Sequence, residues 1–219
     1  MHFPHPHYSL ALFLTAVFSV TVHELGHAAS ALAFGDDTAK RAGRITLNPW
    51  KVSPFGAVLL PGLLVLAGGY PVAFASTPVN PSRMRKPRLH STLCSLAGPG
   101  VNIVLIGVSI LVLRGQAARL LPLGLEYWPF GYLLAFALGY VNVILAVFNL
   151  IPVPPLDGSA LVEHFLPPRY WQGWAKFRQY GFGILFLVLF LGHGLLTRIL
   201  APFVNLWFSA WAPGAGHFI

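Results

Sequence analysis

Long runs of apolar residues dominate the chain, and short segments that hold most of its polar residues separate them. The runs at residues 8–34, 91–113 and 129–151 are each long enough to cross a hydrocarbon core of about 30 Å as a helix. The last apolar region, residues 180–211, is interrupted by polar residues near its middle, and we expect one or two crossings there. The pattern predicts an all-α polytopic membrane protein with about five to six transmembrane helices.

The segment at residues 43–74 combines helix-breaking residues with a short apolar stretch. Residues 44–48, with the sequence RITLN, have weak strand character, and prolines follow them. The apolar residues 57–70 are too few for a full crossing. We therefore expect a small strand followed by a re-entrant or interfacial loop, which needs protein cover or a wet cavity at that depth.

Composition and charge agree with a membrane protein. The chain has 219 residues, of which 56% are hydrophobic and 9% are charged, whereas soluble domains carry about 25% charged residues. We find no sign of a second domain and treat residues 1–219 as one membrane-embedded domain. The net charge of +8 does not indicate a nucleic-acid partner, because the basic residues lie between apolar runs and look like topology signals.

The distribution of Lys and Arg predicts the orientation of the helices. If residues 57–70 enter and leave the membrane by one face, every Lys and Arg except Arg114, Arg119 and Arg198 lies on the same side. Cytoplasmic loops are enriched in these residues, so the first helix should run from the outside to the cytoplasm.

The sequence HELGH, at the cytoplasmic half of the first run, places His23 and His27 one turn apart on the same face of a helix. Two imidazoles in this arrangement can bind one zinc ion, while Glu24 stays free to act as a general base on a bound water, whose pKa zinc lowers to about 7. A chance occurrence is disfavoured, because each charged group near the bilayer centre costs about 2.5–3.5 kcal/mol.

A catalytic zinc site usually has three protein ligands, so a third one is expected. Among the six acidic residues, Asp157 ends the segment NLIPVPPLDG on the face that the first helix reaches, and prolines keep that segment from forming a regular helix. We predict that Asp157 is the third ligand. The alternative is that Asp157 caps a helix that begins near Gly158.

Two asparagines are candidates for contact with the substrate. Asn102 could donate to a scissile carbonyl or to the oxyanion that forms from it, and Asn149 could orient a ligand or the substrate backbone. For both residues, a hydrogen bond between packed helices is the alternative role. His90, His164 and His193 are possible extra ligands, but each lies near an interface or loop, where histidine needs no special role.

HELGH and NLIPVPPLDG, together with GRITLNP (residues 43–49) and AGPGVN (residues 97–102), resemble the site-2 protease family of intramembrane zinc metalloproteases, peptidase family M50. The resemblance covers residues 8–166 and implies one zinc ion per chain and a membrane-associated β-hairpin at GRITLNP. It implies cleavage of membrane proteins within or near a transmembrane helix, in regulated intramembrane proteolysis. It also implies a bacterial inner membrane location and the compact subgroup without a PDZ domain.

Two other functions use the same residues. A membrane metal transporter or metal sensor could use His23, His27 and Asp157 as its metal site, with Glu24 as a proton relay. An inactive relative could retain only the binding of membrane partners. The sequence leaves the oligomeric state open.

Overall fold

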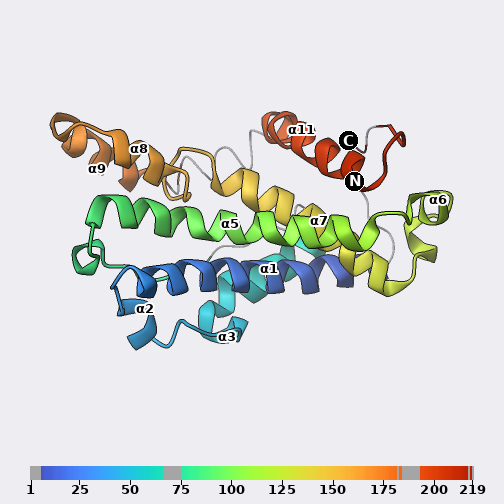
Figure 1. Cartoon of the computed structure of the whole chain (residues 1–219), viewed down its shortest axis with the longest axis horizontal. Coiled ribbons are helices and arrows are strands. Elements are labelled where there is room, and N and C mark those ends of the chain that lie inside the picture. The colour runs from blue at the N-terminus through green and yellow to red at the C-terminus, as the bar shows by residue number, and fades with distance from the viewer. Residues whose placement is uncertain (1–5, 67–74, 182, 184–192, 217, 219) are drawn as a thin grey trace.

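The structure is a computed structural model that describes residues 6–66, 75–181, 183, 193–216 and 218 (Figure 1). Three of its helices are long and apolar enough to cross a membrane: α1 (Pro6–Ala33), α5 (Pro87–Leu113) and α7 (Phe130–Asn149). Each of them packs against the other two, and α11 (His193–Trp211) packs against α7 and α5. The three long helices therefore form the body of the molecule.

The remaining helical elements of the described residues are short. They are α2 (Thr38–Arg41), α3 (Pro49–Val52), a π-helix (Pro54–Leu59), α4 (Leu60–Leu66), α6 (Ala117–Leu120), α8 (Ser159–Phe165), α9 (Trp171–Gln179) and single 3-10 turns at Pro81–Arg83, Leu125–Tyr127 and Pro168–Tyr170.

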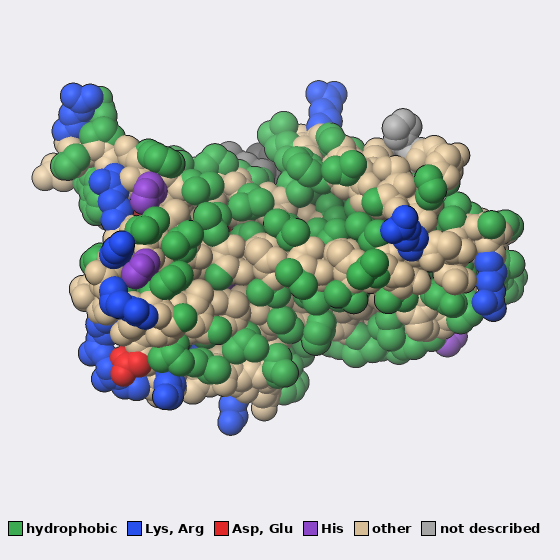
Figure 2. All heavy atoms as spheres, in the orientation of Figure 1, with side chains coloured by type: hydrophobic (Ala, Val, Ile, Leu, Met, Phe, Trp, Pro, Cys, Tyr) green, Lys and Arg blue, Asp and Glu red, His purple; other side chains and the backbone are tan. Residues whose placement is uncertain are grey.

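The burial of the long helices matches a membrane-embedded bundle. α7 is the most buried of the three and supplies much of the apolar core, where Phe136 is 1% exposed. α5 is mostly uncovered, and Val104 and Leu111 on its outer face are 66% and 72% exposed. Apolar side chains spread over the sides of the molecule (Figure 2). Many exposed apolar side chains of this kind suit contact with lipid rather than water.

The predicted spans agree with the structure in part. Residues 8–34, 91–113 and 129–151 correspond to α1, α5 and α7, whereas the prediction was about five to six crossings. The region 180–211 contains α11, but residues 182 and 184–192 lie outside the described residues, so the number of crossings there stays a prediction.

The β-hairpin expected at residues 43–74 is not found in the part of this segment that the structure describes, residues 43–66. The Thr46 amide donates to the Arg44 carbonyl, and the Asn48 side chain accepts from the Trp50 amide and caps α3. These local bonds take up groups that a strand would need for pairing, and no second strand lies beside them in that range. Residues 67–74 lie outside the described part of the chain.

Basic side chains gather at one end of the molecule. In the view of Figure 2, most of the visible Lys and Arg side chains lie at the end where Figure 1 places α2, α9 and the start of α5. α1 runs toward this end, and α5 starts from it (Figure 1). The HELGH segment therefore lies in the half of α1 that is nearer the basic end.

Candidate metal centre

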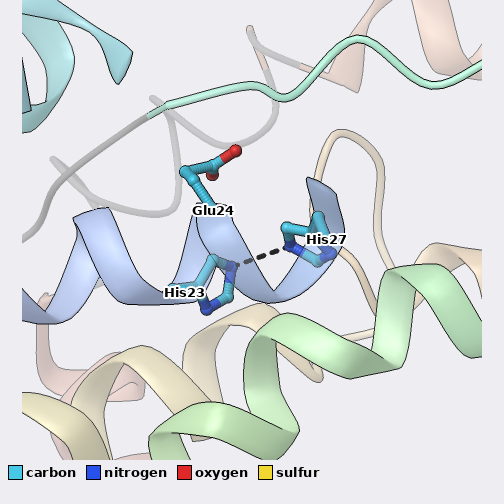
Figure 3. Close-up of side chains that lie close together, drawn as sticks. All are labelled: His23, Glu24 and His27. Carbon is cyan, nitrogen blue, oxygen red and sulfur yellow. Dashed lines mark hydrogen bonds between the residues drawn. The ribbon is translucent and has the colours of Figure 1, made fainter. Parts of the chain in front are cut away.

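α1 brings His23 and His27 together in the interior of the helix bundle. Their exposed fractions are 4% and 7%, and their Nε2 atoms lie 3.1 Å apart (Figure 3). The spacing of four residues on one helix produces this proximity directly.

The other nitrogen of each imidazole is held by α5. Nδ1 of His23 lies 2.8 Å from Oδ1 of Asn102, and Nδ1 of His27 lies 2.7 Å from the carbonyl oxygen of Cys94. Both of these oxygens are acceptors, so each Nδ1 carries the proton and donates. In the neutral imidazoles, both Nε2 atoms then present lone pairs to the same space, and an outer hydrogen bond fixes the orientation of each ring.

Asp157 approaches the two imidazoles from the loop that follows α7. Its Oδ2 lies 3.1 Å from Nε2 of His23 and 3.3 Å from Nε2 of His27. The loop folds back tightly, because the Gly158 amide donates to the Asn149 carbonyl at 2.6 Å. A Cβ atom at residue 158 would lie 2.2 Å from the Leu150 carbonyl oxygen, so only glycine fits there.

The arrangement of Asp157 beside His23 and His27 favours a bound cation. Burial acts to raise the pKa of Asp157, whereas hydrogen bonds from His23 and His27 lower it to about 2 when their Nε2 atoms carry protons. Within the part of the chain that the structure describes, its Oδ2 is buried without a hydrogen-bond partner of good geometry. One proton can bridge only one pair among the three converging atoms, whereas a divalent cation accepts a lone pair from all three.

Zinc fits the observed donor set. Tetrahedral zinc, with ligand distances of about 2.0–2.2 Å, has its ligand atoms roughly 3.3–3.6 Å apart. The three separations in this structure are 3.1, 3.1 and 3.3 Å. Two imidazole nitrogens and one carboxylate oxygen also form a donor set typical of catalytic zinc sites, which keep one further position open.

Glu24 lies beside this centre but faces another direction. It is 4% exposed, and one of its carboxylate oxygens lies within 4.8 Å of the nitrogens of His23 and His27. The side chain points away from the imidazoles (Figure 3), and its Oε2 accepts a hydrogen bond of 2.7 Å from the Thr77 hydroxyl. Of the two nearby carboxylates, Asp157 is therefore the better placed ligand, and Glu24 stays available for proton transfer.

Two adjoining cavities meet at the centre. One has a volume of about 600 Å³, and Val20 and Leu145 line it within the helix bundle. The other, of about 470 Å³, extends past Val79 and Ser91 toward the start of α5. Both are bounded by Glu24 and Asp157, by residues 75–76 on one wall and by residues 155–156 on the other. Together they give a path that passes the candidate metal centre.

The two asparagines occupy different places. Asn102 is fully buried and contacts His23 through Oδ1, while its Nδ2 has no partner within the described part of the chain. Asn149 lines the larger cavity, and its Nδ2 donates to the Leu145 carbonyl at 3.0 Å.

The additional histidines considered from the sequence lie apart from the centre where they are described. The ring of His90 stacks on Phe34 at 4.4 Å, and Nδ1 of His164 lies 3.2 Å from the Thr92 hydroxyl. The side chain of His193 lies outside the description.

Sequence reasoning missed three contributors to the site. Thr77 and the Cys94 carbonyl belong to segments without a recognisable motif. Gly98 lies within the AGPGVN segment, but the sequence did not indicate its specific role at the site. A Cβ atom there would lie 2.4 Å from Nε2 of His27 and 2.6 Å from Nε2 of His23. Any side chain at this position would occupy the space of the imidazoles.

Known proteins resemble this chain over most of its length. Residues 127–192 match the model of peptidase family M50. YwhC of Bacillus subtilis, named as a zinc metalloprotease, is 40% identical over 206 residues, which cover 89% of this chain and 85% of the relative. Rip2 of Mycolicibacterium smegmatis, also named as a zinc metalloprotease, is 33% identical over 193 residues, covering 88% of this chain and 67% of the relative.

A more distant relative, zinc metalloprotease MJ0392 of Methanocaldococcus jannaschii, is 24% identical over 159 residues, or 73% of this chain and 35% of the relative. No solved structure matches the chain. The similarity to YwhC and Rip2 is extensive enough to assign the chain to a protein family. This family is the one that HELGH and NLIPVPPLDG resemble. The chain belongs to peptidase family M50, the site-2 protease family of zinc metalloproteases.

Proposed function

We propose that this chain is an intramembrane endopeptidase in which His23, His27 and Asp157 bind one zinc ion and Glu24 is the general base. The observation that carries the proposal is the convergence of three metal-binding atoms beside a second carboxylate, that of Glu24, in a bundle whose long helices could span a membrane. The substrate is a membrane protein, and the bond that breaks lies within or near its transmembrane helix.

The protein groups divide the chemistry between them. Zinc, when bound, activates water as a nucleophile near neutral pH and polarises the scissile carbonyl. Glu24 takes the proton from the attacking water and passes it to the leaving nitrogen. Asp157 balances the charge of the centre. Asn102 holds the His23 ring, so we assign it this orienting role in place of direct contact with an oxyanion.

The two cavities supply a path for an unwound peptide. The backbone hydrogen bonds of a helical substrate must break before hydrolysis, because its carbonyl groups are otherwise hydrogen-bonded within the helix. Residues 75–79 line this path in an extended conformation, and within the described chain none of them makes a backbone–backbone hydrogen bond. Apart from Pro78, which has no amide hydrogen, these residues have backbone amide and carbonyl groups that can pair with an extended substrate segment. Asn149, on the facing wall, can contact the same segment through Oδ1.

The basic end of the molecule sets the proposed orientation. Lys and Arg concentrate on cytoplasmic faces, so the end that carries α2, α9 and the start of α5 faces the cytoplasm (Figure 2). The centre then lies nearer the cytoplasmic face. Two of the relatives, from Bacillus subtilis and Mycolicibacterium smegmatis, are bacterial, which favours a bacterial cell membrane.

The test is cleavage of a single-span membrane protein in proteoliposomes, with the products mapped by mass spectrometry. We expect zinc-dependent cleavage at bonds within or next to the span, its loss with a chelator and its return with added zinc. Cleavage confined to a soluble tail would contradict the intramembrane assignment. Zinc uptake into sealed vesicles without any cleavage would favour a transporter instead.

A further inference from the structure

Residues 75–80 form an extended segment that runs beside α1 and is joined to it near Glu24. The Thr77 hydroxyl lies 2.7 Å from Oε2 of Glu24 and 3.2 Å from the Glu24 carbonyl oxygen. A hydroxyl has one proton to donate, and the shorter contact is to the carboxylate. The hydrogen bond therefore holds Oε2 of Glu24 and leaves Oε1 free of this contact.

A second connection fixes the other end of this segment. The Asn80 amide donates to Oδ2 of Asp36 at 2.6 Å, just beyond the end of α1. Asp36 is fully buried, and its Oδ1 accepts from the Thr38 amide at 3.0 Å and from the Thr38 hydroxyl. The segment is thus tied to α1 or its immediate continuation at two positions, Glu24 and Asp36. The second tie does not involve Thr77.

We propose that Thr77 is a positioning residue that holds the carboxylate of Glu24 in the orientation needed for proton transfer. This inference rests on the proposed function of Glu24. A glutamate side chain has three rotatable bonds, so an unrestrained carboxylate beside the cavities would spend time away from its working position. One hydrogen bond from a segment that is itself anchored removes much of this freedom before substrate binds, and a small misplacement of a reacting group can reduce the rate strongly.

The hydrogen bond between Asp36 and Asn80 allows the positioning role of Thr77 to be distinguished from a purely structural role. If Thr77 only fastened the segment to α1, the Asp36–Asn80 hydrogen bond would preserve part of that function after Thr77 is changed. Thr77→Val keeps the size and branching of the side chain and removes the donor. Thr77→Ser keeps the donor and removes a methyl group. The pair therefore distinguishes the hydrogen bond from side-chain packing.

The experiment compares these two variants with the wild type and with Thr15→Val. Thr15 is a buried threonine on α1, and among the described residues its hydroxyl bonds only to helix carbonyls, at Ala11 and Leu12. Cleavage kinetics in proteoliposomes give kcat and KM separately, and metal analysis gives the zinc content. For Thr77→Val, we expect kcat to fall by about tenfold or more, with KM and zinc content unchanged. Thr77→Ser and Thr15→Val should keep wild-type kcat.

Infrared spectroscopy supplies a readout that does not depend on activity. The chain contains three glutamates, Glu24, Glu126 and Glu163, so labelling with carboxyl-¹³C glutamate gives few bands. Glu24→Gln identifies the band of Glu24. We expect Thr77→Val to shift this band and Thr77→Ser to leave it in place, because only valine lacks the donor.

Wild-type kcat in Thr77→Val, or an unshifted Glu24 band, would overturn the positioning role. A loss of kcat in Thr77→Ser as large as in Thr77→Val would also overturn it, since the donor is present. Failure of the proposed function looks different: the wild type would cleave no substrate, while the infrared band would still report whether Thr77 holds Glu24.

Discussion

Nδ1 of His23 donates a 2.8 Å hydrogen bond to Oδ1 of Asn102 across the contact between α1 and α5. Both residues are buried, and this bond fixes the tautomer and the direction of the His23 ring. Nε2 of His23 consequently faces Nε2 of His27 and Oδ2 of Asp157. The metal-binding geometry thus depends on a residue that is not itself a proposed ligand.

Asn102→Leu is expected to lower zinc affinity by about 10–100-fold, as is typical when an outer hydrogen bond to a metal ligand is lost. Competition with a zinc chelator of known affinity measures the effect. Asn142→Leu is the matched control, because Asn142 is equally buried but donates to Ser19 at 2.8 Å. An equal loss of zinc affinity in both variants would mean that general destabilisation, rather than His23 orientation, is responsible.

Asp157→Asn should reduce zinc affinity more severely, by more than about 100-fold, because it removes the charge of a proposed ligand while keeping its size. Asp37→Asn is the control: Asp37 is half-buried and pairs with Arg41 and with Arg83. The zinc content of each variant is measured after dialysis against buffered zinc, and it should fall in Asp157→Asn but not in Asp37→Asn. Full retention of zinc by Asp157→Asn would exclude Asp157 as a ligand and leave its role as a loop residue.

Gly98→Ala is expected to disrupt the metal centre, since its Cβ would lie within 2.6 Å of both Nε2 atoms. Gly100→Ala on the same helix is the control, because a Cβ there meets nothing within 4 Å. We expect loss of zinc and of cleavage for the first variant and wild-type behaviour for the second. Normal zinc binding by Gly98→Ala would show that the imidazoles have more room than the structure gives them.

Asp36 should make stability depend on pH. Burial acts to raise the pKa of Asp36, but the Thr38 hydroxyl, the Asn80 and Thr38 amides and the charge of Arg41 together lower it. When folding lowers the pKa of a carboxyl group, the ionised group stabilises the protein at pH values above its unfolded-state pKa of about 3.9. This contribution is lost as the pH falls through the pKa of the folded state.

Asp36→Asn should therefore lower Tm near neutral pH, by about 2–4 °C for each kcal/mol lost in a chain of this size. The difference from wild type should shrink below about pH 4. Thermal unfolding in detergent at several pH values measures it. A Tm difference that stays constant across this pH range would show that the Asp36 charge does not contribute.

Sequence reasoning located the long helices well because apolar length alone determines them. The run at residues 8–34 became α1 (Pro6–Ala33), and the run at 129–151 became α7 (Phe130–Asn149). α5 begins at Pro87, four residues before its apolar run, because proline is favoured in the first turn of a helix. The strand expected at residues 44–48 did not form, since strand propensity without a pairing partner is weak.

The candidate site was predictable only where its geometry is local or follows from topology. His23 and His27 meet because they lie one turn apart, and Asp157 was expected at the same membrane face. The hydrogen bond between Thr77 and Glu24 joins residues 53 positions apart through an extended segment with no periodic pattern. The Cys94 carbonyl, which accepts from His27, is a backbone group, and side-chain identity could not indicate it.

The most direct test of the central claim measures zinc content and cleavage together for Glu24→Gln in proteoliposomes. Glutamine has nearly the size of glutamate and can still accept the hydrogen bond from Thr77, but it cannot take a proton from water. We expect one zinc ion per chain in both proteins and a loss of cleavage by about 10²–10⁴-fold in the variant. Wild-type cleavage by Glu24→Gln with zinc bound would contradict this expectation.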